Sequence, residues 1–498
     1  AYEIGSGLVG SEMCIRDSYA IEHDAMDTTF RSMYQGLYAF MSATKERRDL
    51  LLFQREPQFD VALDKQIAEA ADDFTRIALK AKAAKDYFLL VGPPGTGKTS
   101  CALKKMVETF YKEEGAQILL LSYTNRAVDE ICKALSSIRP EVDFIRVGSE
   151  LSCDENYRDH LIENELATCM RRTEVCERIN RCRILVGTVA SISGKPELFR
   201  LKHFDVAIVD EATQILEPQL LGILCAKGEN GKEGVGKFIL IGDHKQLPAV
   251  VLQNTEQSEV YDEALSAVGL KNLKDSLFER LYRTARQHTD AHRTYDMLCR
   301  QGRMHPEVAL FANQAFYEGR LLPVGLPHQL EDSGNINRLS FYPSQPEPMG
   351  SSAKTNHSEA KIAARLAATV YKEHSEAFDA SRTLGIITPY RSQIALVKKE
   401  IEALGIPELN QILIDTVERF QGSERDVIIY SFCVNYPYQL KFLSNLTEED
   451  GILIDRKLNV ALTRARKQML LTGVPTLLER NPLYKSLLKL IESLRNIA

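Results

Sequence analysis

The sequence contains no apolar run that approaches the ~18 residues needed to cross a bilayer. It also lacks a charged N-terminal segment followed by an apolar stretch, which is the pattern of a secretory signal. We therefore expect no membrane partner and a cytoplasmic protein. A chain of 498 residues with 44% hydrophobic side chains is long enough for about three domains with large buried cores.

Paired cysteines and an excess of basic residues are also missing. The ten cysteines are scattered without a C-x-x-C pair, which argues against a disulfide framework and predicts reduced thiols. The net charge is −6, so nucleic-acid binding would have to come from local clusters of Lys and Arg. No internal repeat and no stripe of basic and aromatic residues is visible.

The first residues fit no regular structure. The stretch GLVGSEMCIRDS, at residues 7–18, has no helix or strand period and resembles translated read-through of a sequencing adapter. We predict that residues 1–18 are a sequence artefact or disordered, and that upstream domains are missing. Residues 19–59 form a predicted helical lead-in, because apolar residues such as Tyr34, Leu37 and Met41 recur at helical spacing.

A glycine-rich stretch, VGPPGTGKTS at residues 91–100, follows the apolar run 87–90 and precedes a helix-compatible segment, 101–111. It matches G-x-x-x-x-G-K-[ST], in which glycines let backbone N–H groups surround phosphate oxygens at a helix N-terminus. Lys98 would reach the β- and γ-phosphates, and Thr99 would coordinate Mg²⁺. The pattern predicts a site for ATP and Mg²⁺ formed by Gly92, Pro93, Pro94, Gly95, Thr96, Gly97, Lys98, Thr99 and Ser100.

Strands and helices alternate downstream of this loop. Apolar strands are predicted at 117–122, 144–147 and 184–187, with a polar turn and a helix after the first, as in a parallel sheet. Functional groups gather at the carboxyl ends of such strands. We therefore predict nucleic-acid contacts there from Thr124, Asn125, Arg126 and Thr188.

Residues 150–182 interrupt this alternation with a charged, helical insertion that carries four cysteines, Cys153, Cys169, Cys176 and Cys182. One reading is an iron–sulfur or other metal site. The other is a set of free core thiols, which the wide spacing of the four residues favours.

Two acidic residues follow the next apolar strand, 204–209. Asp210 can hold Mg²⁺, and Glu211 can accept a proton from the water that attacks the γ-phosphate. A further strand, 237–241, leads into GDHKQLP at residues 242–248. His244 could instead be a metal ligand or a general base, but no partner ligand is spaced near it.

Together, GPPGTGKT (residues 92–99), DEATQ (210–214) and GDHKQLP resemble the superfamily 1 helicases. They are most similar to the branch, superfamily 1B, that contains the nonsense-mediated-decay RNA helicase and its bacterial AAA-domain relatives. The resemblance continues through QGRMHP (301–306), LGIITPYR (384–391), IDTVERFQGSERDVIIYS (414–431) and LNVALTRAR (458–466).

The resemblance implies roles for particular residues. Gln246 would sense the γ-phosphate, and Arg303 and Arg464 would act as arginine fingers, with Arg464 on a helix. Gln66 would read the adenine edge, or it is a solvated helix glutamine. Gly302 departs from the family, in which a tyrosine commonly stacks on the adenine. The remaining implied contacts are Gln421, Gly422 and Glu424 with the nucleotide, and Thr388 and Tyr390 with nucleic acid.

We therefore predict an α/β fold of two RecA-like parallel-sheet domains with the P-loop NTPase arrangement. The first spans 60–275 and the second 285–480, residues 323–357 form a surface excursion, and a C-terminal helix covers 481–498. The expected function is an ATP-dependent helicase or translocase on single-stranded DNA or RNA, moving 5′ to 3′. The alternative is a nucleic-acid-stimulated ATPase that clamps or remodels protein–nucleic-acid complexes without separating strands.

Overall fold

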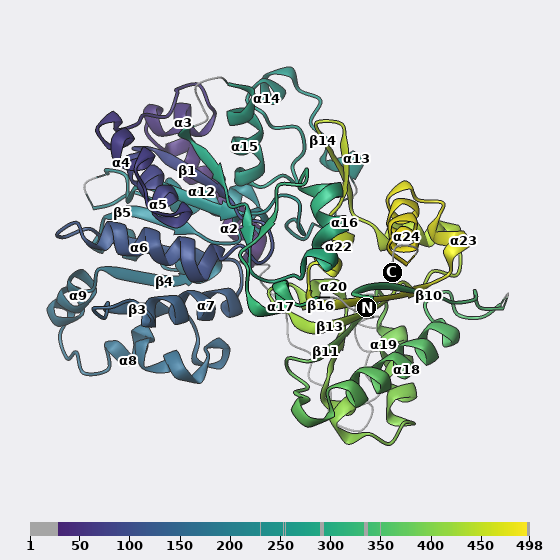
Figure 1. The fold of residues 1–498 in the computed structure, drawn as a ribbon. Helices are drawn as coiled ribbons and strands as arrows, with labels where there is room; N and C mark the ends of the chain where they lie inside the picture. The colour runs from purple at the N-terminus through teal and green to yellow at the C-terminus, as the bar shows by residue number, and fades with distance from the viewer. Residues whose placement is uncertain are drawn as a thin grey trace, which may run out of the picture.

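The computed structural model describes residues 28–229, 231–251, 253, 255–288, 293–332, 337–348 and 350–495. The predicted artefact at residues 1–18, the start of the lead-in at 19–27 and the last three residues lie outside this part of the chain. Two α/β halves, each with a parallel sheet covered by helices, lie next to each other (Figure 1). The predicted α/β class with two parallel sheets is confirmed.

The first half is built on a parallel sheet in the order β3-β4-β2-β5-β6-β1-β7. Its strands are β1 (Tyr87–Val91), β2 (Ile118–Ser122), β3 (Phe144–Val147), β4 (Ile184–Thr188), β5 (Phe204–Val209), β6 (Val235–Gly242) and β7 (Tyr295–Met297). Every residue of β1 and β2 is buried, because helices cover both faces of the sheet.

The helices of the first half include the lead-in and the predicted insertion. They are α2 (Thr28–Ser42), α3 (Lys45–Leu51), α4 (Asp64–Ala68), α5 (Asp73–Ala83), α6 (Lys104–Tyr111), α7 (Asn125–Ser136), α8 (Ile162–Glu165), α9 (Arg172–Arg181), α10 (Val189–Ser193), α11 (Glu197–Leu201), α12 (Glu217–Leu224), α13 (Thr255–Ser258), α14 (Glu263–Ala267) and α15 (Leu277–Gln287). No helix in the described ranges is long and apolar enough to span a membrane.

The lead-in packs on the first sheet rather than standing apart from it. Helix α2 lies against α12 at Gly36, where a Cβ atom would come within 1.7 Å of the Pro218 carbonyl oxygen. Leu50 and Leu51 of α3 join the core on one face of the sheet. The buried Arg47 guanidinium donates to the carbonyl oxygen of Val235 at 2.5 Å. These contacts anchor the lead-in to the first half.

The second half contains a parallel sheet in the order β10-β16-β13-β11-β12. Its strands are β10 (Leu339–Pro343), β11 (Leu384–Ile387), β12 (Leu413–Asp415), β13 (Arg425–Ser431) and β16 (Ala465–Gly473), with the pairs β8 (Arg300–Gln301) and β9 (Leu322–Pro323), and β14 (Leu446–Glu449) and β15 (Ile452–Asp455).

Helices cover both faces of this second sheet, with separate cores on each side. They are α16 (Pro306–Phe316), α17 (Pro327–Leu330), α18 (His357–Glu373), α19 (Arg391–Glu402), α20 (Val417–Phe420), α21 (Leu440–Leu443), α22 (Arg456–Leu462), α23 (Pro475–Leu478) and α24 (Pro482–Arg495). Helix α24 lies within the range predicted for a C-terminal helix.

Three local predictions need correction. Residues 323–357 are not only a surface excursion, because β10 lies there and pairs in parallel with β16 at the sheet edge. Strand β7, at residues 295–297, joins the first sheet beside β1, although the predicted second domain starts at residue 285. Arg464 lies between α22 and β16, not on a helix. The first two differences arise from pairing between distant segments, which local sequence patterns do not encode.

Candidate active site

The glycine-rich loop begins where β1 ends and leads into a π-helical turn, Lys98–Leu103. Gly97 has a φ of 77°, a left-handed conformation that residues with side chains rarely adopt. A Cβ atom at Gly92 would lie 2.1 Å from Cγ of Lys98, so glycine there lets the lysine fold back over the loop. The Lys98 ammonium donates to the Gly92 carbonyl oxygen at 2.6 Å. Loop and lysine form a compact cradle of the kind that binds phosphate.

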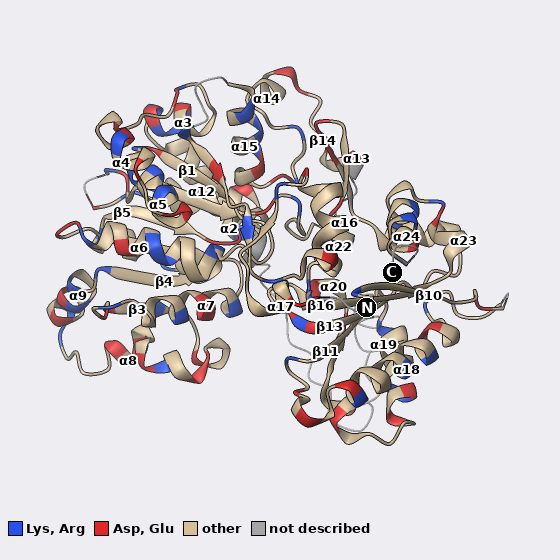
Figure 2. Ribbon diagram, viewed as in Figure 1, with Lys and Arg blue, Asp and Glu red and all other residues tan. Residues whose placement is uncertain are grey.

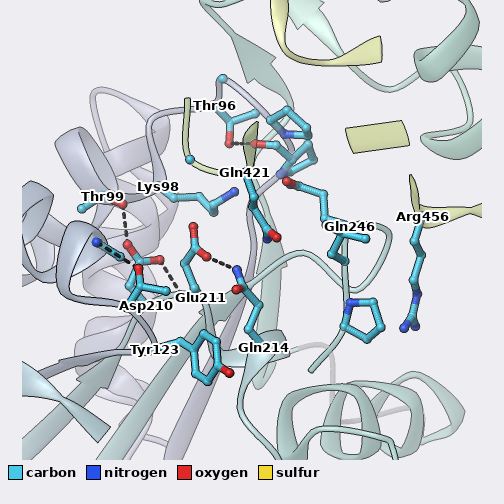
Figure 3. A pocket seen from close by; sticks show the side chains of 18 of the residues that line it. Thr96, Lys98, Thr99, Tyr123, Asp210, Glu211, Gln214, Gln246, Gln421 and Arg456 are labelled. Carbon is cyan, nitrogen blue, oxygen red and sulfur yellow. Dashed lines mark hydrogen bonds between the residues drawn. The ribbon is translucent and has the colours of Figure 1, made fainter. Parts of the chain in front are cut away.

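Two oxygen groups that suit a magnesium ion meet next to this cradle. The Thr99 hydroxyl donates a hydrogen bond to the Asp210 carboxylate, and Asp210 also accepts from the Glu211 N–H at 2.9 Å (Figure 3). Burial raises the pKa of the Asp210 carboxyl. Because Mg²⁺ prefers oxygen ligands, the contact between a hydroxyl and a carboxylate here fits the predicted metal site.

Glu211 has an unusual backbone conformation. Its φ of 54° is left-handed, which is uncommon for a residue other than glycine. Its carboxylate accepts from the Gln214 side-chain amide and lines the same cleft as Lys98 (Figure 3). Burial, followed by the charge of Asp210, raises the pKa of the Glu211 carboxyl. A carboxylate with a raised pKa is suited to accept a proton from water near neutral pH.

The protein around Lys98 changes the pKa of its ammonium group. Burial lowers the pKa of the Lys98 ammonium, although the charges of Asp243 and Glu211 oppose that shift. A cation that is poorly solvated interacts strongly with an anion brought beside it, because little water screens the pair. The cradle therefore favours a charged phosphate group over an uncharged ligand.

A buried hydrogen-bond network connects the two halves behind the cleft. The Gln246 amide and the Tyr317 hydroxyl each donate to Oδ2 of Asp243, both at 2.7 Å. The Asn459 amide of α22 donates to the Tyr317 hydroxyl at 2.8 Å and to the Lys245 carbonyl oxygen at 2.7 Å. Burial raises the pKa of Tyr317 well above its usual value, so its hydroxyl remains a donor. The loop after β6 is thus fixed by side chains from the second half.

The two predicted arginine fingers reach the cleft from the second half. Arg303 donates from Nε to Glu424 at 2.6 Å, and its backbone neighbour Gly302 donates its N–H to the Gly95 carbonyl oxygen at 2.8 Å. A guanidinium nitrogen of Arg464 donates to the Gln246 side-chain oxygen at 3.4 Å. Burial, followed by the positive charge of Arg303, lowers the pKa of Arg464 to about 9. The two guanidinium groups therefore lie close enough to repel each other.

Glu424 forms ion pairs with Arg303 and Arg466. Burial alone would raise the pKa of the Glu424 carboxyl, but Arg303 and Arg466 bring it below its usual value. The structure thus places Glu424 in an ion pair with Arg303. An anion that entered the cleft would compete with Glu424 for this guanidinium.

The phosphate loop, the two carboxylates and the two arginines surround a cleft of about 1550 Å³ between the halves. The predicted site residues that line it are Pro93, Pro94, Gly95, Thr96, Gly97, Lys98, Thr99, Ser100, Asp210, Glu211, Gln246, Arg303, Gln421, Gly422, Glu424 and Arg464. Gly92 lies behind the loop, beneath Lys98. Gln66 is exposed on α4 and is not among the lining residues, so its contact with adenine stays a prediction.

The predicted nucleic-acid residues follow strands of both sheets at their carboxyl ends. Thr124 and Arg126 also line the cleft, whereas Thr188 and Thr388 are buried. The Thr124 hydroxyl accepts from the Ala127 N–H at 3.2 Å and so caps α7, which begins at Asn125. Tyr390 immediately precedes α19. Basic and acidic residues are mixed over both halves in the view of Figure 2, so contacts by all six residues stay predictions.

Some site residues were not predicted from the sequence. Arg456 lines the cleft and is ion-paired with Glu279 of α15, so it joins the second half to the first. Tyr317 and Asn459 belong to the buried network described above. Asn459 lies within LNVALTRAR and Arg456 lies beside it, and Tyr317 follows QGRMHP by eleven residues; that proximity to segments that carry the resemblance was the available signal.

The alternative metal readings receive no support within the described ranges. No three His, Cys, Asp or Glu side chains there come together in a way that could hold a metal ion. Cys153 and Cys182 are buried free thiols, and Cys169 and Cys176 are half-buried. His244 Nε2 donates to the Glu449 carboxylate at 2.8 Å and so contributes to contact between the halves.

Comparison with known families and proteins agrees with this geometry. Two family models, both described as "AAA domain", match the chain, one at residues 69–175 and 162–254 and the other at 273–476. The first match includes the phosphate loop and both acidic residues, and the second includes both arginines. Each half of the chain therefore carries its own family signature.

Curated relatives resemble most of the chain. It is 28% identical to the DNA replication ATP-dependent helicase/nuclease DNA2 of Bos taurus, over 91% of this chain and 42% of that protein. Identity to the Xenopus laevis DNA2 is 30%, over 79% of this chain and 36% of that protein. The Saccharomyces cerevisiae DNA polymerase alpha-associated DNA helicase A is 26% identical, over 82% of this chain and 65% of that protein. The chain thus spans less than half the length of the two DNA2 relatives.

Proposed function

We propose that this chain, which belongs to superfamily 1 of the helicases, hydrolyses ATP to move along a nucleic-acid strand and separate it from its complement. The observation that carries the proposal is the cleft with walls from both halves. Lys98 and Glu211 face it from the first half, and Arg303 and Arg464 from the second. A site divided in this way makes hydrolysis depend on how the halves are placed relative to each other.

The side chains of the cleft account for each part of the reaction. Water attacks the γ-phosphorus, the bond to the bridging oxygen of ADP breaks, and a proton of the water passes to the Glu211 carboxylate. Lys98 and the two arginines offset the charge that develops on the phosphate oxygens. Thr99 and Asp210 would hold Mg²⁺, which supplies further charge neutralisation when bound.

Gln246 contacts both halves and can therefore couple ATP hydrolysis to their relative movement. Its amide contacts Asp243 in the first half, and its oxygen accepts from Arg464 in the second. A γ-phosphate in the cleft would compete for both Arg464 and Gln246, so its release changes the contacts between the halves. Alternating contacts of this kind convert chemistry into opening and closing of the cleft.

We further propose that the strand is single-stranded DNA and that movement runs 5′ to 3′. The choice of DNA is supported by the names of the bovine, frog and yeast relatives, all of which are DNA helicases. The polarity is supported by the resemblance to superfamily 1B.

The test is to measure ATP hydrolysis with single-stranded DNA, with single-stranded RNA and without nucleic acid, alongside displacement from duplexes with a 5′ or a 3′ overhang. Lys98→Ala serves as the inactive control. We expect DNA to stimulate hydrolysis most and only the 5′-tailed duplex to unwind. Stimulation without displacement on either duplex would favour the clamp or remodelling alternative, and unwinding only from 3′ overhangs would refute the polarity.

A further inference from the structure

Three aromatic side chains, two of them exposed and one half-buried, lie on the second half, outside the cleft. Tyr436, Tyr438 and Phe442 occupy the segment that follows β13 and enters α21. The rings of Tyr436 and Tyr438 are stacked, with centroids 5.8 Å apart and planes inclined by 13°. Tyr438 is 55% exposed and Phe442 is 65% exposed, whereas aromatic rings in the sheet's own core are buried. The Tyr438 and Phe442 rings therefore contribute little to the core and present apolar faces to solvent, with the half-buried Tyr436 stacked beside Tyr438.

The backbone beneath these rings is held rigidly. The buried Gln439 side-chain oxygen accepts from the N–H groups of Asn435 and Tyr436, each at 2.9 Å. Its amide donates to the Ala353 carbonyl oxygen at 2.7 Å and to the Tyr390 hydroxyl at 3.2 Å. One glutamine thus joins three segments of the chain. A rigid support of this kind lowers the entropy cost of binding a ligand to the rings.

The adjoining segments carry positive charge. The Ser392 hydroxyl donates to the Lys354 carbonyl oxygen at 2.8 Å, so the backbone at Lys354 lies beside the start of α19, where Arg391 is. Lys441, on α21, lies between Tyr438 and Phe442 in the sequence. These three side chains are exposed, and within the described residues none of them forms an ion pair. The nearby Glu347 is engaged by His357 at 3.1 Å.

We propose that these groups form a platform on which the bases of a single strand stack, while its phosphates lie against the basic residues. The platform consists of Tyr436, Tyr438, Phe442, Lys354, Arg391 and Lys441. Single-stranded nucleic acid is bound by this combination, because every base has a flat π face and every linkage carries a negative charge. The platform deepens the proposed function and rests on it, since it adds a contact for the strand outside the ATP cleft.

The positive charge of the platform favours a nucleic-acid strand over an apolar protein as its ligand. A protein interface is depleted in lysine at its centre, whereas Lys441 lies among the exposed rings in the sequence. The Tyr390 hydroxyl, bonded to Gln439, also joins the platform to a residue that the sequence predicts to contact nucleic acid. Three segments that carry aromatic and basic residues therefore meet at Gln439.

The experiment measures the dissociation constant of a fluorescein-labelled oligo(dT) by anisotropy, with the full chain and its variants. Tyr438→Ala and Phe442→Ala should each weaken binding roughly 10-fold, because one stacked base is lost. Tyr438→Phe should bind like the parent, since it keeps the ring. Tyr261→Ala is the matched control, because Tyr261 is a 79% exposed tyrosine in the first half, away from the platform.

A second measurement addresses charge. Lys441→Ala should weaken binding and reduce the salt dependence of the dissociation constant by about one phosphate contact. Unchanged thermal unfolding midpoints in all variants would show that folding is intact. If the parent binds oligo(dT) and Tyr438→Ala binds equally well, the platform is wrong while the proposed function stands. If the parent binds no single strand, the proposed function fails as well. Self-association that Tyr438→Ala abolishes, with oligo(dT) affinity unchanged, would assign the surface to a protein contact and overturn the proposal.

Discussion

The loops after β1 and β11 start from comparable positions in the two parallel sheets, because each of these strands is second from an edge of its sheet. After β1 the chain has Gly95 and Gly97 in left-handed conformations, with φ of 74° and 77°. After β11 it continues through Thr388, a proline and Tyr390 directly into α19. The first loop can direct successive backbone N–H groups at phosphate, whereas proline in the second has no N–H to donate.

The two halves therefore share a fold but not a chemistry. The first supplies the phosphate cradle and both carboxylates, Asp210 and Glu211. The second supplies two guanidinium groups, which come from the loops before α16 and β16 rather than from the loop after β11. Neither half holds a complete set of charges for phosphoryl transfer. The loops, not the sheets, determine what each half contributes.

The largest mutational effects are expected at two residues of the first half, Glu211 and Lys98. Glu211→Gln should lower kcat about 10³-fold while nucleotide binding persists, because the amide keeps the shape but cannot accept a proton. Lys98→Ala should lose nucleotide affinity as well as turnover. Steady-state hydrolysis and nucleotide titration check both, and normal turnover by Glu211→Gln would show that another group is the base.

A buried carboxyl in the second half should affect stability rather than chemistry. Glu359 of α18 accepts from the Ser431 hydroxyl at 2.7 Å and the Cys433 N–H at 2.8 Å, and burial raises its pKa to about 7. Since this exceeds its usual value of 4.5, the folded state holds the proton through that window, and the unfolding free energy falls as pH rises from about 4.5 to 7.

The total fall should be about 3 kcal/mol, and denaturant unfolding at several pH values measures it. Glu359→Gln should remove this part of the pH dependence and leave the protein relatively more stable above pH 7. Glu373→Gln, an exposed change on the same helix, should leave the dependence as it is. A parent stability that does not fall across this range would contradict the assignment.

The smallest effect concerns Gly302, which borders the cleft beside Gly95. Without an aromatic ring there, we expect similar kcat/KM values for ATP and GTP. A Cβ atom at Gly302 would lie 3.2 Å from Cδ1 of Leu326, the end of a flexible side chain, so a larger residue can be accommodated. Gly302→Tyr should raise kcat/KM about fivefold for ATP and GTP alike, because both purines can stack on the ring and one stack is worth roughly 1 kcal/mol.

Gly302→Ala is the control, because it adds a Cβ but no ring. The kcat/KM values for ATP and for GTP are the quantities to compare. A thousand-fold preference for ATP in the parent would mean that another residue supplies the base contact.

Local sequence patterns predicted the strands that are recognisable from their own residues. Strands β3 and β5 were predicted with their observed bounds, because each is mostly apolar and contains only one charged residue, Arg146 in β3 and Asp205 in β5. Strands β7 and β10 were missed, since they are short and gain their place only by pairing with β1 and β16.

The same limit applies to the candidate site. Lys98, Glu211 and Gln246 belong to short motifs that follow predicted strands, so their place beside the cleft was accessible from sequence. Tyr317 and Asn459 were not predicted, because a buried hydroxyl and amide reveal their partners only when the halves are packed together. The platform around Tyr438 was missed for a similar reason, since three distant segments form it.

The central claim is that both arginines of the second half act on one phosphate held by the first. The most direct test is a double-mutant cycle on kcat with Arg303→Ala, Arg464→Ala and the combined variant. Each single change should lower kcat roughly 10³-fold with a much smaller effect on nucleotide affinity, because an arginine finger acts mainly on the transition state. The combined variant should lose less than the product of the two single losses, since both groups stabilise the same charge. Strictly multiplicative losses, or near-normal hydrolysis by either single variant, would contradict a shared cleft.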